Sequence, residues 1–174
     1  MLVTGGLPPG VQVALPVLLA VAAVVDSRHR RIPNVISLGG CVAGLILGVW
    51  HAGFSGLASS MLGLLVGAGL FLPFYIVRGM GAGDVKLMGA VGAFLGPYHI
   101  IAAAITVALA GGVIAAWAAF KQGRLKTAIM DSWLVAIRAR PAITLDQAGR
   151  EQSIPYGLAI SAGVLFYLMM VIFV

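Results

Sequence analysis

Long stretches without a charged side chain constrain this sequence more than any other feature. Residues 1–25, 32–77, 87–120 and 152–174 contain no Asp, Glu, Lys or Arg. Only 9% of the 174 residues are charged and 61% are hydrophobic, whereas a typical soluble domain is about a quarter charged. These values exclude a soluble globular enzyme and a disordered chain. They predict an all-α integral membrane protein.

The uncharged stretches provide six transmembrane helices if each span takes about 20 residues. Two stretches are interrupted, at 51–55 and at 96–99, by polar residues, Gly or Pro. The expected spans are Leu7–Val25, Asn34–Trp50, Leu57–Val77, Val85–Leu95, Ile100–Phe120 and Ile154–Val174. The fourth reaches only about 16 Å. We therefore expect it to begin within the glycine run 79–83 or to cross a locally thin bilayer.

The basic residues predict the orientation. When six spans alternate in direction, every Lys and Arg lies on one face of the membrane, which is expected to be cytoplasmic, and both termini lie outside. The net charge of +6 then reflects topology and contact with membrane lipids, and no nucleic-acid partner is predicted. Residues 1–174 are predicted to form one transmembrane domain, with a cytoplasmic loop that contains an amphipathic helix at about 121–152.

Glycines recur every fourth residue in two of the expected spans. Gly40, Gly44 and Gly48 lie in the second, and Gly63 and Gly67 lie in the third. Small residues at this spacing let membrane helices approach closely. These glycines are therefore predicted to serve helix packing.

Two carboxyl groups are candidates for chemistry. Asp26 follows the first span and Asp84 opens the fourth, and ionisable groups at membrane depth are usually functional. Both are expected at the cytoplasmic boundary, where a pair of carboxyl groups can share a proton and activate a water molecule. The alternative is structural: Asp26 offsets the nearby arginines, and Asp84 caps a helix.

Three glycines at alternate positions precede Asp84, namely Gly79, Gly81 and Gly83. Glycine permits irregular backbone and close approach of another chain. We expect these glycines to form a loop at positions that require positive φ. An extended peptide is able to lie beside this loop. A phosphate-binding loop is the rival interpretation, but the Walker spacing is absent and no strand precedes the glycines.

Taken together, these residues resemble a known family. Gly-Met-Gly-Ala-Gly-Asp-Val-Lys-Leu at 79–87 is similar to the GxGD signature of the type IV prepilin peptidases. Asp26-x-Arg28 with Ile32-Pro33-Asn34 resembles the first aspartate motif of that family, and Ile154-Pro-Tyr-Gly157 resembles its proline-glycine motif. The short chain is similar to the minimal form associated with Flp/Tad-type pili.

The resemblance implies a membrane aspartic endopeptidase of the bacterial inner membrane. Its substrates are prepilins with a basic leader and a hydrophobic helix, cleaved at the cytoplasmic face for pilus assembly or related secretion. Asp26 and Asp84 correspond to the catalytic pair. The implied active-site loop residues are Gly79, Gly81, Gly83, Pro155 and Gly157, and the supporting residues are Lys86, Arg28, Pro33 and Asn34.

Several functions are not predicted or stay as alternatives. The larger relatives also N-methylate the new terminus and carry paired CxxC motifs, whereas this sequence has one cysteine, Cys41. Neither methyltransferase activity, a metal site nor a cofactor is predicted. A proton- or ion-coupled transporter using the two aspartates, and a non-catalytic pilus assembly subunit, are the alternative functions.

Overall fold

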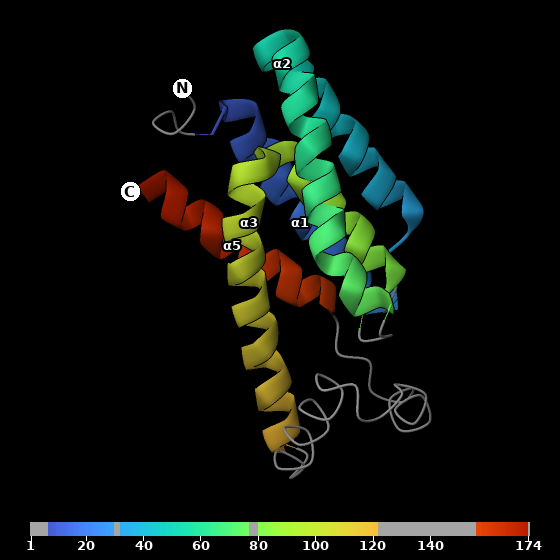
Figure 1. Cartoon of the computed structure of the whole chain (residues 1–174). Helices are drawn as coiled ribbons and strands as arrows, with labels where there is room; N and C mark the ends of the chain where they lie inside the picture. Colours follow the sequence, from blue (N-terminus) through green and yellow to red (C-terminus); the bar gives the residue numbers. More distant parts are fainter. Residues whose placement is uncertain (1–6, 30–31, 77–79, 122–155, 174) are drawn as a thin grey trace.

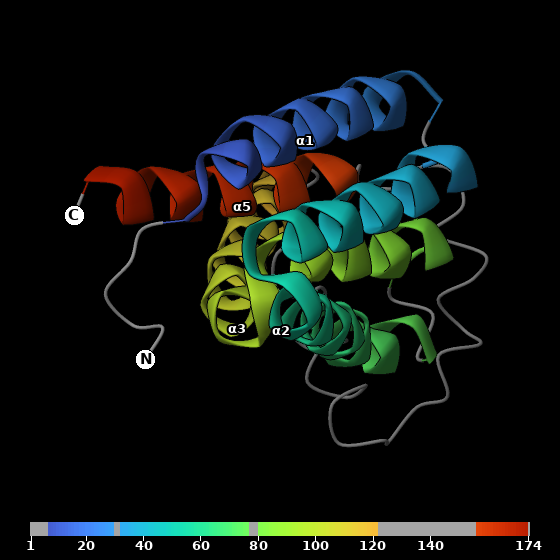
Figure 2. The same ribbon diagram turned by 90° about the horizontal axis from the view of Figure 1, so that it is seen from above.

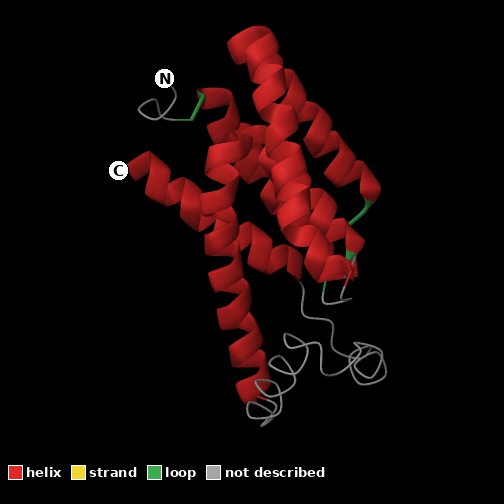
Figure 3. Ribbon diagram, in the orientation of Figure 1, coloured by secondary structure: helices red, strands yellow, loops and turns green. Residues whose placement is uncertain are grey.

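The computed structural model describes residues 7–29, 32–76, 80–121 and 156–173, and each regular element in these ranges is a helix (Figure 1 and Figure 3). The helices are α1 (Pro9–His29), α2 (Asn34–Ile76), α3 (Ala82–Lys121) and α5 (Tyr156–Phe173). By length and composition, α1, α2 and the Ala82–Ile114 part of α3 are able to cross a membrane, and α5 contains a shorter apolar helix, Gly157–Ile172. The all-helical class is therefore as predicted.

The helix α2 is a hairpin of two arms. Ala52 and Gly53 have non-helical backbone angles, and Gly53 has a φ of 56°, a conformation that favours glycine. The two arms fold back on each other. Gly48 of the first arm and Gly56 of the second lie so close together that a Cβ at Gly48 would be 2.9 Å from the Gly56 carbonyl oxygen. The predicted interruption at 51–55 is confirmed.

The helix α3 also breaks into two arms. Gly96 has a φ of 75°, and Pro97 follows it. The second arm returns beside the first, since both Met88 and Ile100 lie next to Gly67 of α2, although a straight helix would hold them about 18 Å apart. This confirms the predicted interruption at 96–99. The described residues therefore form six helical segments.

The first arm of α3 lies at the centre of the bundle. Figure 2 shows α1 along one edge and the second arm of α2 along the opposite edge, with α3 between them. Residues 87–96 of this arm are all buried. The close contacts depend on glycine: a Cβ at Gly44 would lie 2.8 Å from the Ala93 Cβ, and one at Gly63 would collide with the Gly92 carbonyl. The predicted packing role of these glycines is confirmed.

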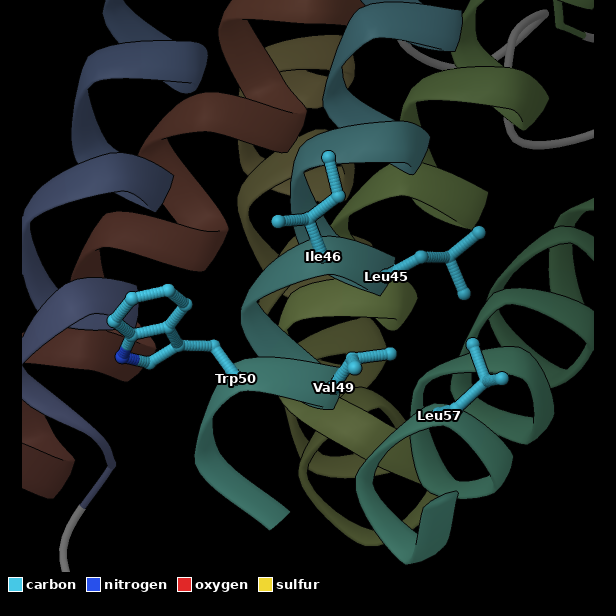
Figure 4. A pocket seen from close by; sticks show the side chains of 5 residues that line it. All are labelled: Leu45, Ile46, Val49, Trp50 and Leu57. Atoms are coloured by element: carbon cyan, nitrogen blue, oxygen red, sulfur yellow. The ribbon is translucent and has the colours of Figure 1, made fainter. Parts of the chain in front are cut away.

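Large apolar side chains cover the outside of the bundle. Trp50 and Phe54 are 83% and 85% exposed, which suits a surface in contact with lipid. Beside the turn of α2, an apolar hollow of about 360 Å³ lies between the two arms; its lining side chains, drawn in Figure 4, are Leu45, Ile46, Val49, Trp50 and Leu57.

One helix boundary near the carboxyl groups differs from the predicted one, and another lies where it was expected. The first span was predicted to end at Val25, but α1 continues to His29, so Asp26 belongs to the helix. The helix α3 begins at Ala82, inside the glycine run, and its first arm is about 20 Å long. The predicted amphipathic helix at about 121–152 lies outside the described residues, apart from Lys121, which ends α3.

Candidate active site

The ends of several helices gather at one end of the bundle. A Cβ at Gly83 would lie 3.2 Å from the Cβ of Ile32, which places the start of α3 against the connection between α1 and α2. The Lys86 Nζ donates a hydrogen bond of 2.9 Å to the Asn34 Oδ1 at the start of α2. This end is called the carboxylate end below, because Asp26 and Asp84 lie there.

Asp26 is held by the first turn of α5. Its side chain is 5% exposed, and its Oδ2 accepts a hydrogen bond of 2.9 Å from the Gly157 N–H. The first N–H groups of a helix have no partner within the helix, and the helix dipole places partial positive charge there. The start of α5 therefore satisfies and stabilises the Asp26 carboxylate.

Only glycine fits at position 157 without a shift of its neighbours. A Cβ at this position would lie 2.7 Å from the Asp26 Oδ2 and 2.9 Å from the Asp26 Cγ, distances that real Cβ atoms essentially never show. The sequence pattern marked Gly157 only through its resemblance to a family motif. Its hydrogen bond to a residue more than 100 positions away was not predicted, because no local pattern encodes it.

Asp84 is held by the first turn of its own helix. Its side chain is 8% exposed, and its Oδ2 accepts a hydrogen bond of 3.2 Å from the Gly81 N–H. The Asp84 N–H donates to the Gly81 carbonyl at 3.1 Å. This reciprocal arrangement resembles a capping box, so the structural role considered for Asp84 is present.

The structure brings the two carboxyl groups together. They come from different helices, and the charge of Asp26 acts on Asp84. Each is buried, and each uses an Oδ2 atom to accept a backbone N–H from a glycine. Repulsion between two neighbouring carboxylates disfavours the state in which both are ionised. Such a pair has the chemistry of an acid and a base in one site.

The glycine run is more helical than predicted. Gly81 and Gly83 do not have positive φ; within the described residues that conformation is confined to Gly53 and Gly96. Gly83 lies inside α3, and its lack of a side chain lets Ile32 pack against the helix. The expectation of positive φ before Asp84 was wrong because close packing, rather than an unusual backbone, requires glycine here.

The remaining predicted site residues take different positions. Lys86 is exposed and donates a hydrogen bond to Asn34, a partner that the sequence did not predict. Arg28 and Pro33 are exposed. Gly79 and Pro155 lie outside the described residues. In the described part of the chain, no group of three His, Cys, Asp or Glu side chains is arranged to hold a metal ion.

These features define a helical membrane protein with two buried carboxyl groups at one end of the bundle. The model of the Type IV leader peptidase family matches residues 13–116. The chain therefore belongs to that family. The matched range includes Asp26 and Asp84 and ends before Gly157.

Two curated proteins are similar to the chain over part of their length. Each is a "Prepilin leader peptidase/N-methyltransferase" of Burkholderia pseudomallei, one from strain 1026b and one from strain K96243. Each is 32% identical over 120 residues, which cover 63% of this chain and 37% of the relative. The chain thus matches well under half of the length of these relatives. No solved structure gives a significant match.

Proposed function

We propose that the chain is a membrane-embedded aspartic endopeptidase that removes the basic leader from Flp-type prepilins. In this proposal it crosses the bacterial inner membrane six times with both termini outside. Its carboxylate end faces the cytoplasm. Membership of the Type IV leader peptidase family supports the reaction class, and the distribution of Lys and Arg supports the orientation.

One observation carries the proposal. Asp26 and Asp84 are the acidic residues of the described part of the chain, and both are buried at the same end of the bundle with their charges interacting. Burying two carboxyl groups is costly. Capping of α5 by Asp26 and of α3 by Asp84 does not by itself require the two carboxyl groups to lie close enough for their charges to interact.

The proposed mechanism uses the pair as base and acid. The ionised carboxyl group takes a proton from water, and the water oxygen bonds to the carbon of the scissile carbonyl. The protonated carboxyl group donates its proton to the leaving nitrogen as the C–N bond breaks. Since Gly81 and Gly157 engage the Oδ2 atoms, we assign the water to the Oδ1 atoms.

The test is direct cleavage. The purified full chain in detergent is incubated with a prepilin, and the masses of the products are measured. The proposal expects two fragments, with the cut directly after the basic leader and no methyl group added to the new terminus. An intact prepilin after prolonged incubation would contradict the peptidase and favour a transporter or an assembly subunit.

A further inference from the structure

An apolar groove opens on the side of the bundle near the carboxylate end. It has a volume of about 470 Å³ and lies between the second arms of α2 and α3 and the start of α5. Residues of all three elements and of the segment before α3 line it; they include Leu70, Phe74, Met80, Ile105, Gly112 and Ala159. Pockets of this size hold parts of ligands or several side chains.

The groove and the two carboxyl groups share two short stretches of backbone. Met80 lines the groove, and the next residue, Gly81, donates its N–H to Asp84. Ala159 lines the groove two residues after Gly157, which donates its N–H to Asp26. A chain segment that lies in the groove therefore has one end beside the carboxyl pair.

One wall of the groove is suited to a helix. Ala104, Ala108 and Gly112 line it at intervals of four residues along α3, the spacing that brings membrane helices close together. A Cβ at Gly112 would meet nothing within 4 Å, so space is open beside this end of the wall, whereas Ala104 at the other end packs against the core. The exposed faces of Phe74 and Ile105, 56% and 59% exposed, open the groove towards lipid.

The charge pattern selects the occupant. The groove lining contains no ionisable side chain, whereas its inner end adjoins two carboxyl groups. A peptide segment with a basic stretch followed by an apolar helix is complementary to this site. Its basic stretch lies near the two carboxyl groups, and its apolar helix lies in the groove. A lipid chain matches the apolar part, but it does not explain why the groove ends at the carboxyl pair.

We propose that this groove binds the hydrophobic helix of the prepilin substrate, so that the peptide bond before the helix lies at Asp26 and Asp84. This inference rests on the proposed peptidase function and adds where the substrate docks. The helix lies along the small residues of α3, and its first turn reaches Met80. Burial of apolar side chains in the groove contributes to substrate affinity and leaves the chemistry to the carboxyl pair.

The first test fills the groove. Gly112→Leu is compared with Gly69→Leu, because both glycines are exposed helical positions where a Cβ meets nothing within 4 Å, and Gly69 lies outside the groove. Two substrates are used: the full prepilin, and a peptide that ends before the hydrophobic helix. We expect Gly112→Leu to raise the KM for the prepilin about tenfold, equivalent to about 1.4 kcal/mol of binding, with unchanged kcat/KM for the peptide. Equal KM values in the two variants would overturn the inference.

The second test does not depend on cleavage. A photocrosslinking amino acid replaces Ala108 in an Asp84→Asn background. Leu109, which is 66% exposed and is not among the residues that line the groove, is the control position. Irradiation with prepilin in lipid nanodiscs should give a protein–prepilin adduct at 108 and not at 109. Adducts with lipid alone at 108 would overturn the groove assignment. Absence of prepilin cleavage by the wild type would contradict the peptidase proposal. The crosslink at position 108 would still show whether the prepilin binds in the groove.

Discussion

The carboxylate end and the opposite end of the bundle use glycine for different reasons. At the carboxylate end, Gly157 and Gly83 have ordinary backbone angles. A Cβ at Gly157 would collide with Asp26, and one at Gly83 would make a tight contact of 3.2 Å with Ile32. At the opposite end, Gly53 and Gly96 have positive φ and reverse the direction of the chain. A glycine thus permits a close contact in one region and a backbone conformation in the other. Substitutions should therefore fail in different ways in the two regions.

The largest expected difference between the two ends is their side of the membrane. In a Cys41→Ala background, a cysteine in place of His51, next to the α2 turn, should react fully with an impermeant thiol reagent added outside intact cells. A cysteine in place of Arg28 should react only after lysis. Both side chains are exposed, so access to the reagent differs only through the membrane. Labelling of position 28 from outside would show that the proposed orientation in the membrane is wrong.

The next largest effect concerns the carboxyl pair. Asp26→Asn and Asp84→Asn should each lower the rate of prepilin cleavage at least about 10³-fold, because each removes one partner in proton transfer. The double variant should be no slower, since the two groups act as one unit.

Substitutions of other acidic residues provide the control for that prediction. Asp131→Asn, Asp146→Asn and Glu151→Gln change acidic residues between α3 and α5 in the sequence, and they should retain substantial activity. Measured cleavage rates near the wild-type value in either single active-site variant would rule out the aspartic mechanism.

A smaller loss is expected at Gly157. Gly157→Ala introduces a Cβ within 2.7 Å of the Asp26 Oδ2, so the carboxyl group or α5 has to move. A displacement of about 1 Å in an active site costs up to about 100-fold in rate, and we expect a 10- to 100-fold fall in kcat on that basis. Gly39→Ala, where a Cβ meets nothing within 4 Å, should keep the wild-type kcat. A Gly157→Ala variant as active as Gly39→Ala would show that this contact has no role in catalysis.

The smallest effect belongs to the α2 turn. A Cβ at Gly53 meets no atom within 4 Å, but its φ is positive, so Gly53→Ala should lower the free energy of unfolding by about 1–3 kcal/mol through backbone strain alone. Cleavage should be unchanged. Reversible unfolding in a detergent–denaturant series measures the difference, with Gly69→Ala as the helical control. An equally stable Gly53→Ala variant would contradict the assigned backbone conformation.

The sequence by itself determined the helical class, the two chain reversals and the candidate carboxyl groups. Charge-free stretches and the breaks at 51–55 and 96–99 are local signals, because hydropathy and helix-breaking residues act within a few positions. The motif around Asp84 and the one around Asp26 were sufficient to indicate the family that the comparison with its model establishes.

The tertiary structure alone decided which distant groups meet. The Gly157–Asp26 hydrogen bond, the Lys86–Asn34 hydrogen bond and the contact of Gly83 with Ile32 join segments whose faces come together only when the helices pack. Helix periodicity does not specify the partner of a given face. The sequence does not show which glycines are needed for close packing. The atoms that an added Cβ would contact in the folded structure distinguish them. The groove likewise exists only because parts of α2, α3 and α5 that are far apart in the sequence come together around it.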